Sequence, residues 1–345
     1  MASKSDPYHP YKDRFTNPQG PGDARPTAMD IIADEDLHGK LTGHVILITG
    51  AASGIGIETA RALHATGATL YLAVRDVAKG EQVADDVLRS SSDQSAIIKV
   101  LPCDLSSLSS VRACAHAFLA QNSTLNILVN NAGIMAVPTR TITTDAHELQ
   151  FATNYLGHFL LFALLRPALL AAAAASPAFD SRVINVSSLG HRASTLQFAD
   201  LAFTNGQYTP FGAYGQIKTA LIWMANSIQR RYAKHGLTAN SLNPGGISTG
   251  LQKHMPRETL ERFAGDEGVR RSMLSVEQGA ATTVWAAVGR VWKGDGGRYL
   301  EECGVAERAS GNTPYTGFAQ HAFDEEGEER LWRISFGLVG VEDDD

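Results

Sequence analysis

A glycine-rich turn between an apolar run and a helical pattern constrains the fold of this chain more than any other feature. Residues 45–48 read Val-Ile-Leu-Ile, residues 49–56 read Thr-Gly-Ala-Ala-Ser-Gly-Ile-Gly, and a helical stretch begins near Glu58. This is the strand, turn and helix order of a dinucleotide-binding unit. An ordinary glycine-rich loop is the alternative, but the strand and helix on either side favour the nucleotide site.

Each glycine of the turn meets a separate physical requirement. Gly50 gives the tight turn its backbone freedom, Gly54 lets the chain approach a pyrophosphate without a Cβ atom, and Gly56 lets the helix pack closely on the sheet. The helix N-terminus then offers unpaired N–H groups and the positive end of its dipole. An anionic cofactor can therefore be held here without a basic side chain.

A second feature is the sequence Tyr-Gly-Gln-Ile-Lys, in which Tyr214 and Lys218 are four residues apart. On a helix this spacing places a phenol and an ammonium group on one face. A solvated helix face is the ordinary explanation of such a pair. Beside a nucleotide site, however, the pair predicts an acid/base device, because a nearby cation lowers a tyrosine pKa from its usual value of about 10. A nucleotide and a proton donor together imply hydride transfer.

Composition agrees with a globular enzyme and argues against other classes. The chain has 345 residues, of which 44% are hydrophobic, enough for one large α/β domain with extensions. Its net charge of −6, with Lys and Arg scattered, argues against a nucleic-acid partner. Cys103, Cys114 and Cys303 are too few and too scattered for a disulfide framework or a metal site. We therefore expect buried thiols, a reducing compartment and no metal.

Apolar runs alternate with helical stretches after residue 38. This pattern predicts an α/β fold with a single Rossmann-type, doubly wound parallel sheet and helices on both faces. No linker divides residues 39–345, so they are expected to form one domain. The expected strands, besides the first, are residues 68–74, 96–101, 125–129, 182–186 and 238–242.

The two ends of the chain lack these patterns. Residues 1–38 are rich in Pro, Gly and Asp without apolar periodicity, which predicts an extended or disordered arm. They contain no apolar signal-peptide core, and the alanine-rich run 167–178 is shorter than the ~20 residues of a membrane span. The acidic residues 342–345 are expected to form a solvated tail. Together these features predict a cytoplasmic protein with no membrane span.

Five further motifs follow one another in a fixed order. They are Cys103-Asp104-Leu105, Asn-Asn-Ala-Gly-Ile-Met at 130–135, Asn-Tyr-Leu-Gly-His-Phe at 154–159, Val-Ile-Asn-Val-Ser-Ser at 183–188 and Asn-Pro-Gly-Gly-Ile-Ser-Thr at 243–249. With the glycine turn and the Tyr-Lys pair, their order and spacing resemble the short-chain dehydrogenase/reductase family. The resemblance covers about residues 39–339 and is greatest to the retinol-dehydrogenase and WW-domain-oxidoreductase-like branch.

The resemblance implies four catalytic residues. Tyr214 would protonate a carbonyl oxygen, or remove a hydroxyl proton in the oxidative direction, while Lys218 tunes Tyr214 and holds the nicotinamide ribose. Ser188 would bind the substrate oxygen. Its neighbour Ser187 competes for that role, but adjacent side chains of a strand point to opposite faces, so only one can serve. The resemblance selects Ser188, because the family's serine is the second of the pair. Asn154 would hold a water that links Lys218 to solvent, and a helix-packing amide is its alternative role.

The end of the second strand bears on the choice of nucleotide. NAD-preferring members place an acidic residue where this chain has Val74, and the next residue, Arg75, can bind a 2′-phosphate. NADP(H) is therefore preferred, while Asp76 keeps NAD(H) open because it can pair with Arg75 or accept a ribose. Asp104 would accept from the adenine amino group. The other expected cofactor-binding residues are Gly50, Ser53, Gly54, Ile55, Gly56, Leu105, Asn131, Ala132, Gly133, Pro244, Gly245, Ile247 and Thr249, with Tyr214 and Lys218.

The expected substrate is a small hydrophobic carbonyl compound or alcohol. Two loops, about 189–213 and 250–275, are expected to form a pocket wall and a lid. The aromatic residues of the first loop are as consistent with loop packing as with ligand contact. A catalytically silent NADP(H)-binding regulator and a membrane-associated retinoid or lipid dehydrogenase are the alternatives. A homo-oligomer remains open.

Overall fold

The sheet has the order β3-β2-β1-β4-β5-β6-β7-β8 in the computed structural model, which describes residues 6–91, 97–176, 178–310 and 315–343. All neighbouring strands are parallel except β7 and β8, which form an antiparallel pair. The strands are β1 Val45–Thr49, β2 Thr69–Val74, β3 Ile98–Pro102, β4 Ile127–Asn130, β5 Ser181–Val186, β6 Leu237–Leu242, β7 Tyr299–Glu301 and β8 Gly304–Val305. The predicted doubly wound parallel sheet is confirmed, and each predicted strand is present within two residues of its expected bounds.

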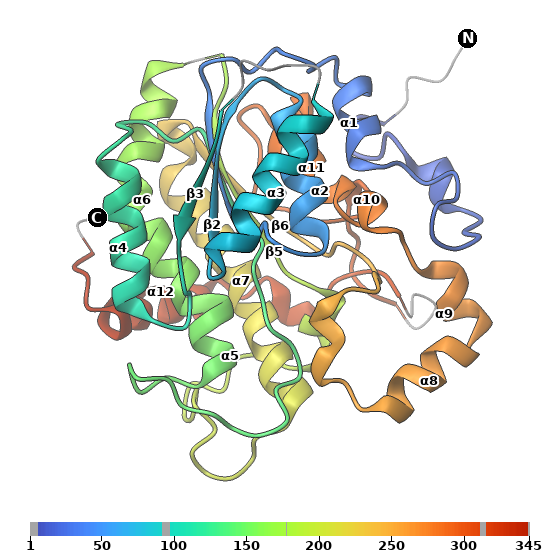
Figure 1. Cartoon of the computed structure of the whole chain (residues 1–345). Helices are drawn as coiled ribbons and strands as arrows, with labels where there is room; N and C mark the ends of the chain where they lie inside the picture. Colours follow the sequence, from blue (N-terminus) through green and yellow to red (C-terminus); the bar gives the residue numbers. More distant parts are fainter. Residues whose placement is uncertain (1–5, 92–96, 177, 311–314, 344–345) are drawn as a thin grey trace.

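Helices cover both faces of the sheet (Figure 1). Leu47 contributes to the core under one helical layer, and its neighbours Ile46 and Ile48 contribute to the core under the other, as strand alternation requires. The first layer contains α4 Leu108–Leu119, α6 Gly157–Ala175, α7 Pro210–Tyr232 and α12 Glu325–Val339. The second contains α1 Ala28–Asp34, α2 Ile55–His64, α3 Val77–Ser90 and α11 Ala281–Val288.

Shorter helices connect and extend these layers. The short α-helices are α5 Leu149–Phe151, α8 Arg257–Gly265, α9 Glu267–Ser272 and α10 Val276–Gly279. The 3-10 turns are η1 Lys12–Phe15, η3 Leu189–Ala193, η4 Ala233–His235, η5 Gly250–His254, η6 Arg290–Trp292 and η7 Gln320–Ala322, and η2 Ala152–Leu156 is a π-helical turn. In Figure 1, α8 and α9 project from the body of the molecule at the lower right.

The expectation of an extended or disordered arm before residue 39 is wrong for the residues that the structure describes. Ala28, Ile31 and Ile32 lie one helical turn apart and are buried, so α1 packs its apolar face on α2 and α11. A reciprocal capping box starts this helix, with Thr27 and Asp30 each bonding the other's backbone N–H. The periodicity escaped the sequence analysis because it spans only one and a half turns between Pro- and Gly-rich segments.

The segment Leu149–Ala175 is the one stretch of the described residues that is long and apolar enough to cross a membrane. It joins α5, η2 and α6, and 67% of its most apolar window is buried inside the fold. Core helices of globular proteins meet the same length and composition criteria. Here the helix supports the sheet, and its π-helical turn contains Asn154.

Candidate active site

A cleft of about 600 Å³ lies at the carboxyl edge of the sheet. Carboxyl ends of parallel strands meet at one edge, which is where open α/β sheets bind their ligands. All but two of the sequence-predicted site residues border it, the exceptions being Gly56 and Asn154. Those at the cleft are Gly50, Ser53, Gly54, Ile55, Arg75, Asp104, Leu105, Asn131, Ala132, Gly133, Ser188, Tyr214, Lys218, Pro244, Gly245, Ile247 and Thr249. A second hollow of about 780 Å³, between the C-terminal end of α7 and the start of α12, contains none of them.

The glycine turn has the geometry that its sequence predicts. Gly50 has a φ of +69°, and a Cβ there would lie 2.8 Å from the backbone of Ala132. Gly54 also has a positive φ, of +56°, and lies beside Thr249 across the cleft. Gly56 is a packing residue, since a Cβ there would lie 2.5 Å from the carbonyl oxygen of Gly50. The start of α2 is thereby brought against the carboxyl end of β1.

A buried hydrogen-bond network that sequence reasoning missed fixes the loop after β4. The backbone N–H groups of Asn131 and Ala132 both donate to Thr49 Oγ1 at 3.0 Å. His158 Nε2 lies 2.8 Å from the same oxygen, and His158 Nδ1 lies 2.7 Å from the carbonyl oxygen of Asn154. Burial lowers the pKa of His158 to about 4, so it is neutral at physiological pH. The signal in the sequence is the spacing of His158, four residues after Asn154 on one helix.

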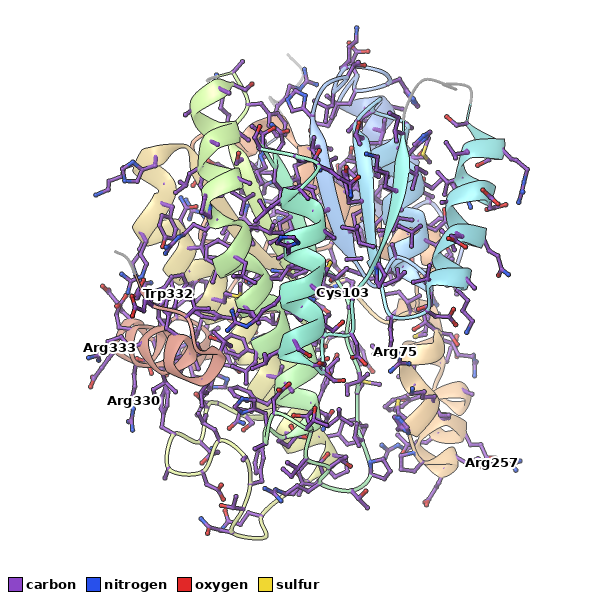
Figure 2. The ribbon with its side chains drawn as sticks, turned by 60° about the vertical axis from the view of Figure 1, so that its left-hand side comes forward. Arg75, Cys103, Arg257, Arg330, Trp332 and Arg333 are labelled. Carbon is purple, nitrogen blue, oxygen red and sulfur yellow. The ribbon has the colours of Figure 1, made fainter. Side chains whose placement is uncertain are left out.

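Arg75 stands at the end of β2, on the side of the molecule from which α8 with Arg257 projects (Figure 2). Its side chain is exposed and forms no ion pair with a residue that the structure describes. Asp76 does not pair with it: the Asp76 carboxylate caps α3 by accepting from the N–H of Lys79 and lies 3.5 Å from the Lys79 ammonium. Lys79, which sequence reasoning missed, borders the same end of the cleft.

The rest of the nucleotide side is shaped by backbone turns. Asp104 accepts two hydrogen bonds from Ser106 through Oδ1, which fixes its carboxylate at the rim of the cleft. Thr249 starts η5 with a capping box to Gln252. Gly245 has a φ of +95° and packs against Leu274. Gln252 and Lys253, which also border the cleft, were missed because no motif marks them.

Tyr214 lies on α7 with its phenol beside Ser188, the residue that begins η3. The short turn η3 packs directly on the tyrosine, since a Cβ at Gly190 would lie 2.9 Å from Tyr214 Cε1. Ser188 Oγ accepts from the N–H of Gly190 at 3.0 Å and lowers the pKa of Tyr214 through a hydrogen bond. The serine and tyrosine hydroxyls therefore face the same part of the cleft.

Ser187 and Ser188 have different surroundings, as strand alternation predicts. The Ser187 hydroxyl donates to the backbone carbonyl of Lys218 at 2.6 Å and is buried. Its hydrogen is thus used within the fold. The placement agrees with the choice of Ser188 as the residue that meets the substrate, and its catalytic role stays a prediction.

Lys218 is buried one helical turn after Tyr214. Its ammonium nitrogen donates to the carbonyl oxygen of Val186 at 2.8 Å and lies 5.4 Å from the centre of the Tyr214 ring. Burial lowers the pKa of Lys218 from 10.5 to about 7. The lysine is therefore poised between its two protonation states near neutral pH.

The structure shows no net lowering of the Tyr214 pKa, and the tuning role of Lys218 stays a prediction. Burial raises the pKa of Tyr214 to about 12, and the hydrogen bond from Ser188 offsets only part of that rise. Desolvation is the dominant cause because both side chains lie almost wholly inside the protein. The phenol is consequently protonated at neutral pH.

Asn154 uses its side chain to hold the loop after β4. Its Oδ1 accepts from the N–H of Ile134 at 2.7 Å, and its Nδ2 donates to the carbonyl oxygen of Ile134 at 2.8 Å. A Cβ at Gly133 would lie 3.3 Å from Asn154 Oδ1 and 3.8 Å from Lys218 Nζ, so the three residues adjoin. The structure favours the packing role for the amide, and the water relay stays a prediction.

The first predicted substrate loop is packed against the protein. Phe198 stacks on Trp223, and the Tyr208 hydroxyl donates to the carbonyl oxygen of Val137 at 2.7 Å. Phe203 packs on Tyr208. The ring-bearing residues of this loop do not border the cleft in the part of the chain that the structure describes; they are His191, Phe198, Phe203, Tyr208 and Phe211. The second loop is mainly helical, formed by η5, α8 and α9, and its base, residues 251–253, borders the cleft.

The cleft fits a nicotinamide dinucleotide. At one end the glycine turn and the N-terminus of α2 border the cleft, and the backbone N–H groups that begin a helix can bind a pyrophosphate. At the other end Gly133 and Lys218 border the cleft side by side, and the Lys218 ammonium group could bind the sugar of the reactive half. A hydride donor placed between these ends would lie beside Tyr214 and Ser188.

Comparison with known proteins agrees with this geometry. The sequence profile of the short chain dehydrogenase family matches residues 44–259, more than half of the chain. The short-chain dehydrogenase/reductase prx1 of Penicillium roqueforti is 47% identical over 96% of this chain and 95% of its own. The polyprenol dehydrogenase of Mus musculus is 38% identical over 87% of this chain and 84% of its own. A solved structure of an uncharacterised protein from Mycobacterium paratuberculosis, 31% identical, aligns with a TM-score of 0.66 over 92% of this chain and 98% of its own.

Proposed function

This chain belongs to the short-chain dehydrogenase/reductase family and is an oxidoreductase with a nicotinamide dinucleotide cofactor, and we propose that it interconverts a carbonyl group and an alcohol on a small hydrophobic substrate with NADP(H). One observation carries the proposal. The Tyr214 phenol, the Ser188 hydroxyl and the Lys218 ammonium group border the same cleft as the glycine turn. A proton donor, an oxygen-binding hydroxyl and a dinucleotide site are the three parts that carbonyl reduction needs.

In the reductive direction, NADPH supplies a hydride to the carbonyl carbon when bound. The Tyr214 phenol gives its proton to the carbonyl oxygen, and Ser188 donates a hydrogen bond to that oxygen as negative charge develops. With its pKa raised to about 12, Tyr214 holds the proton at neutral pH, which favours reduction. Lys218 holds the ribose, and its protonated form eases loss of the phenol proton by favouring the phenolate.

The preference for NADP(H) rests on the charges beside β2. Arg75 forms no ion pair with the residues that the structure describes, and the carboxylate of the adjacent Asp76 caps the N-terminus of α3 and pairs with Lys79. A guanidinium in this position can bind a 2′-phosphate through two hydrogen bonds. The Asp76 carboxylate is correspondingly less available to a free ribose.

A hydrophobic substrate is favoured by the lid and by the relatives. Leu260 and Phe263 on α8 are exposed, 39% and 41%, although they are apolar. An apolar ligand beneath α8 would remove such surface from water. A 38% identical relative is named polyprenol dehydrogenase, which acts as a precedent for an apolar alcohol in this branch.

The experiment is NADPH oxidation by the purified protein, followed at 340 nm, with a panel of aliphatic aldehydes, ketones and quinones. Turnover of apolar members with NADPH, and slower turnover with NADH, supports the proposal. The same protein is titrated with NADPH by fluorescence. Tight NADPH binding with no turnover of any panel member would favour the silent regulatory protein instead, and no binding would reject both.

A further inference from the structure

The lid formed by α8 and α9 lacks the apolar anchorage of the other helices. Both helices lie wholly within the described residues, and neither contains a buried residue. Figure 1 places them away from the two helical layers. Helical stability in proteins comes mostly from packing of an apolar face, so this lid needs another source of order.

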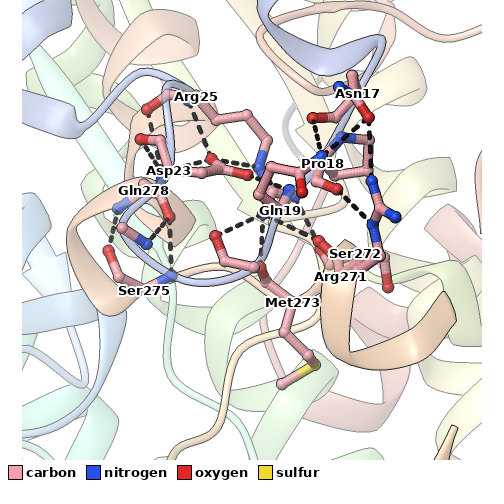
Figure 3. A network of polar contacts seen from close by, with 12 residues as sticks. Asn17, Pro18, Gln19, Asp23, Arg25, Arg271, Ser272, Met273, Ser275 and Gln278 are labelled. Atoms are coloured by element: carbon pink, nitrogen blue, oxygen red, sulfur yellow. Dashed lines mark hydrogen bonds and ion pairs between the residues drawn. The ribbon is translucent and has the colours of Figure 1, made fainter. Parts of the chain in front are cut away.

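The N-terminal residues 17–25, here called the arm clamp, supply polar contacts to the lid's C-terminal end (Figure 3). The Arg25 side chain is only 5% exposed. It donates to the carbonyl oxygens of Ser272 at 2.8 Å, Met273 at 2.6 Å and Arg271 at 3.3 Å. These are the carbonyls that a helix leaves unpaired where it ends, and a cation is favourable there. On its other side, the guanidinium group forms an ion pair with Asp23, whose carboxylate accepts from Arg25 Nε at 2.8 Å.

Two further contacts join the arm clamp to the lid and to the helix after it. Arg271 of α9 donates from Nε to the carbonyl oxygen of Pro18 and from Nη2 to Asn17 Oδ1, both at 3.0 Å. Gln278 of α10 donates from Nε2 to the carbonyl oxygens of Asp23 and Arg25, both at 3.1 Å. The arm clamp therefore binds both sides of the segment in which the lid rejoins the fold.

That segment continues directly to the cofactor loop. The N–H of Leu274 donates to the carbonyl oxygen of Gly246 at 2.8 Å, and Leu274 pairs with Ile247 in a β-bridge. Met273 Sδ would lie 3.1 Å from a Cβ at Gly246. Residues 245–247 border the cleft. A displacement of residues 271–274 would therefore move part of the wall of the cleft.

We propose that the arm clamp is the structural anchor of the substrate lid, with Arg25 as a positioning residue that sets substrate affinity without touching substrate or cofactor. This inference rests on the proposed function, because it assigns the lid to the substrate of that reaction. Arg25 contacts the lid through several backbone carbonyl oxygens, and its planar guanidinium group can donate to all of them at once. For holding the lid, this geometry therefore matters more than the positive charge alone.

Hydrogen exchange of the full-length protein tests the anchor without any substrate. Arg25→Gln removes the fork, Arg25→Lys keeps the charge, and Arg290→Gln is the matched control. Arg290 is an exposed residue that ties Glu35, beside α1, to η6 through an ion pair at 2.9 Å and does not contact the lid. We expect exchange at residues 266–274 to be about tenfold faster in Arg25→Gln, with a smaller rise in Arg25→Lys. Exchange there should be unchanged in Arg290→Gln, and β1, β4 and β5 should stay protected in all three.

Kinetics separate a positioning role from a general structural role. With decanal as the apolar probe, Arg25→Gln should raise KM about tenfold and change kcat less than twofold, while the Kd of NADPH should rise by a clearly smaller factor, because only the Leu274 contact reaches the cofactor loop. If Arg25→Gln does not fold, Arg271→Gln, which loses only the contacts to Asn17 and Pro18, should give the same pattern at about threefold. Equal loss of NADPH and decanal affinity, or unchanged exchange in the lid, would overturn the proposal.

The two proposals fail in distinguishable ways. A parent protein that binds NADPH but does not reduce any carbonyl would reject the proposed function, while faster lid exchange in Arg25→Gln would still establish the arm clamp as the anchor. Turnover in the parent together with an unchanged lid in Arg25→Gln would reject the arm clamp alone.

Discussion

The carboxyl edge of the sheet and the lid differ in what holds them in place. At the sheet edge, backbone approaches backbone so closely that Gly50 and Gly56 leave no room for a methyl group. In the lid, helices α8 and α9 contain no buried residue, and the carbonyl groups at the end of α9 accept hydrogen bonds from Arg25. The edge is fixed by packing, whereas the lid is fixed by a few polar contacts.

This difference separates two tasks of the enzyme. A rigid edge is suited to binding the cofactor, which is the same in every turnover. Its preorganised dipoles and hydrogen-bond donors need no rearrangement when the cofactor binds. A substrate must enter and leave, so the part that covers it belongs to the less stable end of the fold. The proposed acid/base pair lies on the rigid side, since Tyr214 and Lys218 are buried in α7.

The largest expected effect is the loss of the proton donor at the rigid edge. Tyr214→Phe should lower kcat about 10²–10⁴-fold, the usual contribution of a general acid, with the Kd of NADPH nearly unchanged. Stopped-flow measurement of NADPH oxidation and a fluorescence titration check both values. Ser187→Ala is the control, because its hydroxyl bonds only within the fold and its loss should be mild. Activity of Tyr214→Phe within a few-fold of the parent would exclude the mechanism.

A second test concerns the cost of burying Lys218 at that edge. Its pKa is 10.5 when unfolded and about 7 when folded, so the unfolded chain binds more protons between these values and stability rises with pH across that window. Lys218→Met removes this dependence. Its stability relative to the parent should be greatest at pH 6 and about 2–3 kcal/mol smaller at pH 9. Urea unfolding at both pH values gives the two differences, and parallel pH profiles would contradict the buried-lysine account.

The third test substitutes one glycine in each region. Gly56→Ala places a Cβ 2.5 Å from the carbonyl oxygen of Gly50 and should cost about 1–3 kcal/mol of stability. Gly265→Ala, at the end of α8, meets no atom within 4 Å and should leave stability unchanged or slightly raised. Thermal unfolding of the two variants measures the contrast. Equal shifts in Tm would mean that the edge is no more tightly packed than the lid.

The features that the sequence predicts lie mainly at the carboxyl edge of the sheet. The turn at 49–56, the strands and the side-chain pair of Tyr214 and Lys218 were predictable, since short-range spacing and backbone sterics determine them. Strand alternation predicts that only one of Ser187 and Ser188 can meet the substrate, and the family resemblance, in which the serine is the second of the pair, selects Ser188. At the carboxyl edge of the sheet, the local structure that short-range spacing predicts is the structure that the fold adopts.

Properties that depend on distant segments were not predictable. The pKa of Tyr214 rises because the whole fold buries it, and a charge four residues away does not reveal that. Asp76 caps α3, so its availability to Arg75 or a ribose depends on where that helix begins. Arg25 meets the lid across nearly 250 residues of chain, and no local pattern marks the contact. For α1 the sequence does contain a helix signal, which is the spacing of Ala28, Ile31 and Ile32 after the N-cap residue Thr27.

The most direct test of whether the carboxyl edge and the lid act separately measures the Kd of NADPH and the KM for decanal in two variants, Arg75→Ala and Phe263→Ser. Arg75→Ala should raise the Kd of NADPH about tenfold, near the lower limit for a charged hydrogen bond because the side chain is exposed, and leave that of NADH unchanged. Its KM for decanal should stay constant. Phe263→Ser should do the reverse, raising the KM for decanal and leaving the Kd of NADPH unchanged. If each variant changes both constants by the same factor, the edge and the lid do not act separately and the account is wrong.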